Sequence, residues 1–155
     1  MISPELLRRF PFFGFMDDAQ LKAVAMISEE ISLATEETIL EADHDAKSLY
    51  FLTNGSASNY CIAKDSNQQG YYKEFFISDI NPGEIFGISA LIEPYQYTAT
   101  IRASKPGQAI KINASSLRAL CEVDSKLAYC LMRETARAAI ERLNDTHIQL
   151  AAARA

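Results

Sequence analysis

The stretch 81–103 constrains the fold of this chain more than any other part of the sequence. Its Pro-Gly pair at 82–83 predicts a tight turn, because proline presets one turn dihedral and glycine accepts a positive φ. Residues 88–92 suffice for one helical turn, which Pro94 ends because proline lacks a backbone N–H. Residues 97–103 place β-branched side chains at alternating positions and predict a strand. A short helix that opens after a glycine presents free backbone N–H groups, which suits an anion.

Three segments of this stretch follow a known pattern: Gly-Glu-Ile-Phe-Gly at 83–87, Ala-Leu at 90–91 and Thr-Ala-Thr-Ile-Arg-Ala at 98–103. They resemble the phosphate-binding cassette of the cyclic nucleotide-binding domain family, found in catabolite-activator-type regulators and protein kinase A regulatory subunits. In that family a cassette glutamate holds the ribose 2′-hydroxyl and a cassette arginine pairs with the cyclic phosphate. An alignment without gaps puts Ile88 at the glutamate position and Tyr97 at the arginine position. Both family charges are therefore missing.

The resemblance implies a ligand site in the cassette and a lid on the last helix. The cassette residues are Gly87, Ile88, Ser89, Ala90, Tyr97 and Thr98, and the possible lid residues are Arg142 and Leu143. A hydrogen bond to a charged group contributes about 1.5–3 kcal/mol, and a tenfold change in affinity is about 1.4 kcal/mol. Without both charges we expect cAMP and cGMP binding to be about two to four decades weaker than in the family, or absent. No other cofactor is indicated.

The middle of the chain has the pattern of short β-strands separated by turn residues. The expected strands are Ile31–Leu33, Thr38–Leu40, Ser48–Leu52, Ser58–Ala63, Tyr71–Ile80, Thr98–Ala103 and Gln108–Ile112. Asn-Gly at 54–55 predicts a hairpin, residues 65–70 a polar hairpin tip, and Lys-Pro-Gly at 105–107 another turn. This pattern alone indicates a β-rich sandwich or barrel.

The segments 39–43 and 49–55 also resemble the cyclic nucleotide-binding domain family. The resemblance implies a mainly β fold with flanking helices, namely an eight-stranded jelly roll with N-terminal helices and a long C-terminal helix. We expect a single domain over 1–155, divided into N-terminal helices (1–29), the jelly roll (30–113) and C-terminal helices (114–155).

The N-terminal segment predicts a short helix broken by Pro11, then a phenylalanine-rich loop, then a helix to about Ser28 that Asp17 or Asp18 caps. The phenylalanines at 10, 12, 13 and 15 either mark a partner site or cover one end of the barrel, and we favour the cover.

The C-terminal segment predicts two helices, the first capped by Ser115 or Ser116 and the second by Asp124. The second helix is expected to run from about Ser125 to at least Leu143, and as far as Leu150 if the spacing continues. Its side chains at coiled-coil spacing are Met132, Ala136, Ala139, Leu143, Thr146 and Leu150. This stripe either packs on the chain's own barrel or forms a parallel homodimer, and we favour the dimer because the family uses this helix as a dimer interface.

Several classes of function are disfavoured. The net charge of −5 argues against a nucleic-acid surface, and no sequence remains after the last helix for a recognition helix. We expect no membrane span and a cytoplasmic protein. The three cysteines form no CxxC pair and are expected to be buried, reduced thiols, and the two histidines are expected at the surface. The sequence shows no catalytic motif, so we expect neither an enzyme nor a metal site.

Two functions remain open from the sequence. The first is a regulatory sensor module with an altered ligand site. The second is a ligand-free dimerising scaffold that engages another protein. The cassette cavity discriminates between them: an open polar cavity at Gly87–Ala90 that faces Thr98 favours the sensor, whereas a cavity filled by Ile88 and Tyr97 favours the scaffold.

Overall fold

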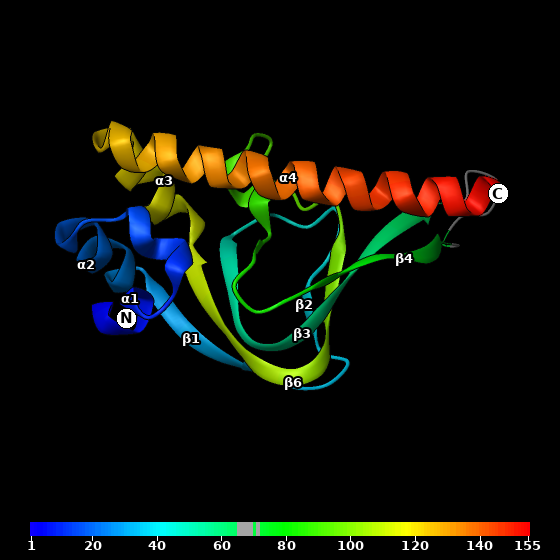
Figure 1. Ribbon diagram of the computed structural model, residues 1–155, viewed down its shortest axis with the longest axis horizontal. Coiled ribbons are helices and arrows are strands. Elements are labelled where there is room, and N and C mark those ends of the chain that lie inside the picture. Colours follow the sequence, from blue (N-terminus) through cyan, green and yellow to red (C-terminus); the bar gives the residue numbers. More distant parts are fainter. Residues whose placement is uncertain (65–69, 71) are drawn as a thin grey trace.

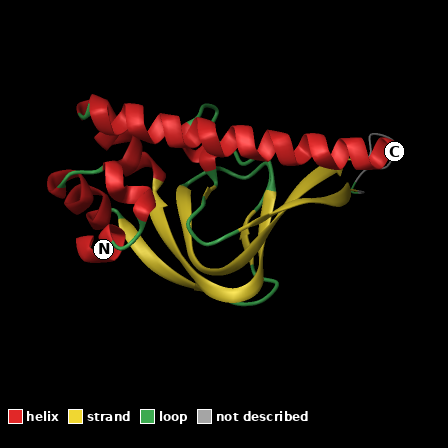
Figure 2. Cartoon of the chain, in the orientation of Figure 1, coloured by secondary structure: helices red, strands yellow, loops and turns green. Residues whose placement is uncertain are grey.

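The computed structural model describes residues 1–64, 70 and 72–155. In chain order the elements are α1 (Pro4–Arg8), the 3-10 helix η1 (Pro11–Phe15), α2 (Asp18–Met26), β1 (Ser28–Leu33), β2 (Thr38–Leu40), β3 (Ser48–Lys64), β4 (Tyr72–Ile80), β5 (Ile85–Phe86), the 3-10 helix η2 (Ile88–Leu91), β6 (Thr100–Asn113), α3 (Ala114–Val123) and α4 (Ser125–Arg154). The strands curl into a roll, the N-terminal helices gather at one end, and α4 lies along one side of the whole roll (Figure 1, Figure 2).

The described strands form one antiparallel sheet in the order β1-β6-β3-β4, with β2 paired to β6 and β5 paired to β3. The fold is therefore mainly β with flanking helices, as expected. The sheet bends strongly because β3 and β6 are long and bend together, with register shifts between Leu52 and Ala57. Each of these two strands takes the place of two shorter strands in the expected jelly roll, so six strands are described where the family pattern implied eight.

The expected hairpin at 54–55 and the expected turn at 105–107 are wrong, because the chain does not reverse at either point. Both segments lie inside long strands, where they face each other. Gly55 has a φ of +90°, and a Cβ atom on Gly107 would lie 2.1 Å from the Asn54 carbonyl oxygen. The glycines therefore bend two paired strands at a point of close backbone contact. Of the expected hairpin tip, residues 65–69 lie outside the described residues, as does Tyr71 of the next strand.

The N-terminal helices close one end of the roll. Asp17 caps α2 through a capping box: its Oδ1 accepts from the Gln20 N–H at 2.8 Å, and Gln20 Oε1 accepts from the Asp17 N–H at 2.9 Å. The helix ends at Met26, slightly before the expected Ser28. Phe13 is buried, and its ring centroid lies 5.0 Å from that of Phe51 on β3. The aromatic loop thus covers an end of the barrel.

The C-terminal helices follow directly from β6. Asn113 caps α3, so the expected cap at Ser115 or Ser116 is wrong by two to three residues. Asp124 caps α4 as expected, since its Oδ1 accepts from the Leu127 N–H at 3.0 Å. The 30 residues of α4 carry it beyond Leu143, the least extent that we expected, and four residues beyond Leu150. Within the described part of the chain, no helix has both the length and the apolar composition needed to cross a membrane.

Candidate functional site

The cassette forms the strand, turn and short helix that its sequence predicts. The turn at 81–84 is tied to β3, because the Gly83 N–H donates to the Leu52 carbonyl at 2.8 Å and the Leu52 N–H donates to the Glu84 carbonyl at 3.0 Å. Gly87 adopts the left-handed conformation at the start of η2 with a φ of +73°. A Cβ atom there would lie 3.2 Å from the Ser48 carbonyl oxygen. Glycine is therefore required where the chain enters η2.

A cavity of about 370 Å³ lies between η2, the segment 97–99, the inner face of the sheet and α4. Its lining includes most of the residues that the resemblance assigned, namely Gly87, Ile88, Ser89, Tyr97, Thr98, Arg142 and Leu143. Ala90 does not line it, because this residue is fully buried in the core behind η2. The cavity persists beside Ile88 and Tyr97, which therefore do not fill it.

The Tyr97 side chain is buried, and its hydroxyl is hydrogen-bonded to the backbone of Ser48. Its hydroxyl donates to the Ser48 carbonyl oxygen at 2.6 Å and accepts from the Ser48 N–H at 3.3 Å. Only 7% of Tyr97 is exposed, and this burial raises the pKa of its phenol to about 12. At the position of the family arginine, the chain thus offers a neutral phenol whose donor proton is already used.

Arg142 of α4 is the cation that reaches the cavity. Its guanidinium donates to the carbonyl oxygen of Ile85, the first residue of β5, two residues before Gly87. Burial lowers the pKa of Arg142, while the charges of Glu84, Glu141 and Asp145 oppose this shift. Arg142 therefore fixes α4 to the cassette strand, and three carboxylates near it compensate its charge.

Two further arginines near the cassette are engaged outside the cavity. Arg102 lies on the other face of β6 and forms a two-fold ion pair with Glu74 of β4, with one N···O distance of 2.7 Å. This pair lowers the pKa of Glu74 and raises that of Arg102. Arg118 of α3 donates to the Ala90 carbonyl at 2.6 Å and lies 4.0 Å from the centroid of the Tyr95 ring. Sequence reasoning missed this support for the cassette helix, because α3 and η2 are distant in sequence.

Sequence reasoning also missed the inner wall that β3 contributes. Asn59 and Cys61 line the cavity, two residues apart on one face of the strand. Asn59 is nine-tenths buried, and its Oδ1 accepts no hydrogen bond from the residues that the structure describes. Cys61 is exposed, contrary to the expectation of buried thiols, while Cys121 and Cys130 are partly buried and all three are free. The sequence did hold a signal for this wall, because Asn59 is a polar residue at a position of β3 that faces inward.

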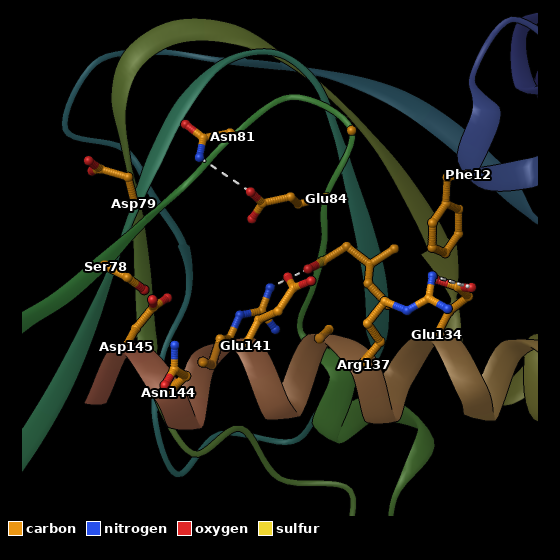
Figure 3. Close-up of a pocket in the computed structure, with 14 residues that line it drawn as sticks. Phe12, Ser78, Asp79, Asn81, Glu84, Glu134, Arg137, Glu141, Asn144 and Asp145 are labelled. Carbon is orange, nitrogen blue, oxygen red and sulfur yellow. Dashed lines mark hydrogen bonds and ion pairs between the residues drawn. The ribbon is translucent and has the colours of Figure 1, made fainter. Parts of the chain in front are cut away.

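A second hollow, of about 560 Å³, lies on the other side of Arg142 between α4 and the turn that follows β4. Figure 3 shows its carboxylates facing across it, with Asn81 donating to Glu84 and Arg137 paired with Glu134. The carboxylates that line it are Asp79, Glu84, Glu134, Glu141 and Asp145, against the two arginines 137 and 142. This excess of negative charge disfavours an anionic ligand. Among the described residues, no group of side chains has the arrangement of a metal site.

The outward face of α4 carries large apolar side chains at coiled-coil spacing. They are Tyr129, Ile140 and Leu150, each at least half exposed, together with the small exposed Ala136. This stripe differs from the expected one, because Met132 packs against the core and Ala139, Leu143 and Thr146 line the cavity.

Comparisons with known proteins agree with this geometry. Residues 30–124 match the family model of the cyclic nucleotide-binding domain. A solved structure from Geobacter metallireducens, named for cyclic-nucleotide binding, is 38% identical, covers 92% of this chain and 99% of its own, and has a TM-score of 0.76. A comparison with curated proteins found no match.

Two more distant structures are sensor or N-terminal domains of transcriptional regulators. The sensor domain of the regulator DNR from Pseudomonas aeruginosa is 18% identical, with a TM-score of 0.68 and coverage of 87% of this chain and 91% of its own. The N-terminal domain of a regulator from Streptomyces coelicolor is 25% identical, with a TM-score of 0.63 and coverage of 90% and 95%.

Proposed function

The chain belongs to the cyclic nucleotide-binding domain family, and from this membership we propose that it is a non-catalytic regulatory sensor module, located in the cytoplasm, with weak or lost affinity for cAMP and cGMP. The proposed ligand site is the cavity under α4, formed by the cassette residues Gly87, Ile88, Ser89, Tyr97 and Thr98 and covered by Arg142 and Leu143. Ala90 supports this site from behind.

The observation that carries the proposal is the state of Tyr97. Its hydroxyl proton is given to the Ser48 carbonyl, so the position that bears an arginine in the family supplies neither a charge nor a free donor. Ile88 offers no acceptor for a ribose hydroxyl, and Arg142 is held by the Ile85 carbonyl with carboxylates near it. The cassette itself then offers a cyclic phosphate its backbone and the Ser89 and Thr98 hydroxyls.

The mechanism that we propose is closure of α4 over the cavity. Because Arg142 joins α4 to β5 beside the cassette, a ligand that contacts both the cassette and Leu143 would favour the closed arrangement over an open one. A ligand shifts such an equilibrium only by its difference in affinity for the two states. The conformation of α4 would then report the occupancy of the cavity.

We also propose a parallel homodimer through the outward face of α4. The large side chains at coiled-coil spacing would be half exposed in a monomer, and a second copy of the same helix would cover them. The alternative of a ligand-free scaffold would use the same surface to engage another protein. The open cavity of about 370 Å³ favours the sensor, because a scaffold has no need of a space between the cassette and α4. Its lining is more apolar than we expected for a sensor, since Leu40, Ile77 and Ile101 contribute to it.

Calorimetric titration with cAMP and with cGMP tests the proposed function, with thermal denaturation of the same samples alongside. We expect no saturable binding at micromolar nucleotide and no rise in melting temperature. A micromolar dissociation constant for either nucleotide would overturn the claim that Ile88 and Tyr97 disable the site.

A further inference from the structure

The outward face of α4 includes one side chain whose charge changes near neutral pH. His147 is exposed, seven residues after Ile140 and three before Leu150, which are exposed apolar side chains of this face. Residues at such coiled-coil spacing lie along one stripe of a helix. His147 therefore lies within the stripe that the proposed homodimer would cover, and histidine is the side chain that ordinarily changes its charge between about pH 5 and pH 8.

The neighbours of His147 along this face of α4 carry no charge. The residues three and four positions away are Leu143, Asn144, Leu150 and Ala151. Asp145 is closer in sequence, but it lines the hollow between α4 and the turn after β4. Among the described residues, His147 takes part in no ion pair. A positive charge on its imidazole therefore has no carboxylate beside it on this face of the helix.

The roll contacts the opposite side of α4. The elements that pack on this helix near His147 are β4 and β5. Gln149 donates to the carbonyl of Ile77 on β4, and Arg142 donates to a carbonyl of β5. Both donors lie on the other side of the helix from His147, because successive residues advance by about 100°. β5 has no charged side chain, and β4 meets α4 on that other side, so the charged side chains of β4 do not face His147; they are Lys73, Glu74 and Asp79.

A second copy would bring the same stripe to the interface. In a parallel pair each stripe residue lies opposite its own copy, so two His147 side chains would meet there. The charged residues at the same heptad position are Arg133 and Arg154, and both are exposed. The acidic residues of α4 line the hollow instead, namely Glu134, Glu141 and Asp145. The charged side chains of this stripe are therefore basic, and protonation of His147 adds like charge to it.

We propose that His147 makes the α4 interface pH-sensitive: protonation of this residue in both copies at mildly acidic pH shifts the dimer toward monomer. This inference rests on the proposed function, because it names the regulation of the proposed homodimer. At neutral pH two uncharged imidazoles are tolerated, as other single polar residues are at such positions of coiled coils. Two imidazolium groups in one layer repel each other and lose hydration there, so acid favours the separated copies.

The test is sedimentation equilibrium of the full chain at about pH 7.5 and about pH 5.5, at constant ionic strength. An imidazole in water is about one-tenth protonated at the first pH and about nine-tenths at the second, whereas carboxylates stay largely ionised at both. The variants are His147→Gln, which cannot gain a charge, and His147→Lys, which is charged at both pH values. His44→Gln is the control, because His44 is the other histidine of the chain and is exposed beside Glu41. Circular dichroism establishes that each protein keeps its fold.

We expect the dissociation constant of the wild-type dimer to be about tenfold higher at the lower pH, the size of one like-charge contact between partly hydrated groups. His147→Gln should have the same dissociation constant at both pH values, and His44→Gln should behave as wild type. His147→Lys should dissociate at the higher pH as readily as wild type does at the lower pH.

A wild-type dimer whose dissociation constant is independent of pH would overturn this inference and leave the proposed homodimer standing. A pH dependence that His147→Gln retains would overturn it in the same way. If wild type is a monomer at both pH values at micromolar protein, the proposed homodimer itself is wrong, and the role of His147 fails with it. The titrations with cAMP and cGMP decide the nucleotide claim separately.

Discussion

Replacing Tyr97 with phenylalanine tests the packing of the cassette most sharply, because the change removes one oxygen atom. That oxygen donates to the Ser48 carbonyl at 2.6 Å and accepts from the Ser48 N–H at 3.3 Å, and both residues are buried. Removing one partner from a buried hydrogen bond costs about 1–3 kcal/mol. For a chain of this length each kcal/mol lowers the melting temperature by about 2–4 °C, so we expect Tyr97→Phe to melt about 2–12 °C lower.

The same substitution changes the stability at alkaline pH. Burial raises the pKa of Tyr97 from 10.0 to about 12, so between these values the unfolded chain loses the phenolic proton while the folded chain keeps it. The free energy of unfolding of wild type therefore falls as pH rises through this window, by about 2–3 kcal/mol from Tyr97. Tyr97→Phe lacks this contribution. Burial also raises the pKa of Tyr50, which is present in both proteins. The difference between them therefore reports Tyr97 together with its coupling to Tyr50, whose charge also raises the pKa of Tyr97.

The assay is urea denaturation followed by circular dichroism, for wild type and Tyr97→Phe, at pH 8 and at intervals between about pH 10 and pH 12. A control is Tyr72→Phe, because Tyr72 on β4 is 60% exposed. We expect the control to match wild type at every pH. If Tyr97→Phe has the stability of wild type at pH 8 and the same loss above pH 10, the hydroxyl is not held by Ser48 and our account of the cassette fails.

Three further changes test other parts of the structure. Gly107→Ala should destabilise the fold by about 1–3 kcal/mol in urea denaturation, because the new Cβ would overlap the Asn54 carbonyl; Gly14→Ala, where nothing lies within 4 Å, is the control, and equal stabilities would contradict the bend. Arg142→Gln should speed amide hydrogen exchange in the second half of α4, because the hydrogen bond to the Ile85 carbonyl is lost. Arg133→Gln is the control, and unchanged exchange in Arg142→Gln would show that this hydrogen bond does not hold α4 on the roll. Ile140→Glu should shift a dimer toward monomer in sedimentation at micromolar protein, whereas Glu141→Gln should not; a wild-type monomer would refute the proposed interface.

The sequence predicted the fold class and the cassette, because both depend on local signals. Asp17 and Asp124 cap the helices as expected, and Gly87 begins η2. The bends at 54–55 and 105–107 could not be predicted, because the same Asn-Gly and Pro-Gly signals mark a hairpin in an isolated strand pair. Only the pairing of β3 with β6 reveals that two glycine-containing segments meet and bend together.

The positions of the proposed site residues could be predicted in part. Most of the cassette residues and the lid residues Arg142 and Leu143 line one cavity, whereas Ala90 lies behind it. That this cavity is the ligand site stays a prediction. The direction of the Tyr97 side chain and the inward position of Asn59 depend on contacts across 49 residues with Ser48 and across the sheet with Ile101. The orientation of α4 also depends on long-range contacts. The packing of this helix on the roll decides which of its apolar side chains remain exposed.

The central claim is that Ile88 and Tyr97 remove the charges that cyclic-nucleotide binding needs from an otherwise intact cavity. Calorimetric titration of cAMP into wild type and into the double variant Ile88→Glu/Tyr97→Arg, with circular dichroism to establish folding, tests it most directly. We predict that the folded double variant binds cAMP about two to four decades more tightly than wild type. Micromolar affinity of wild type, or a folded double variant with no gain in affinity, would contradict the claim.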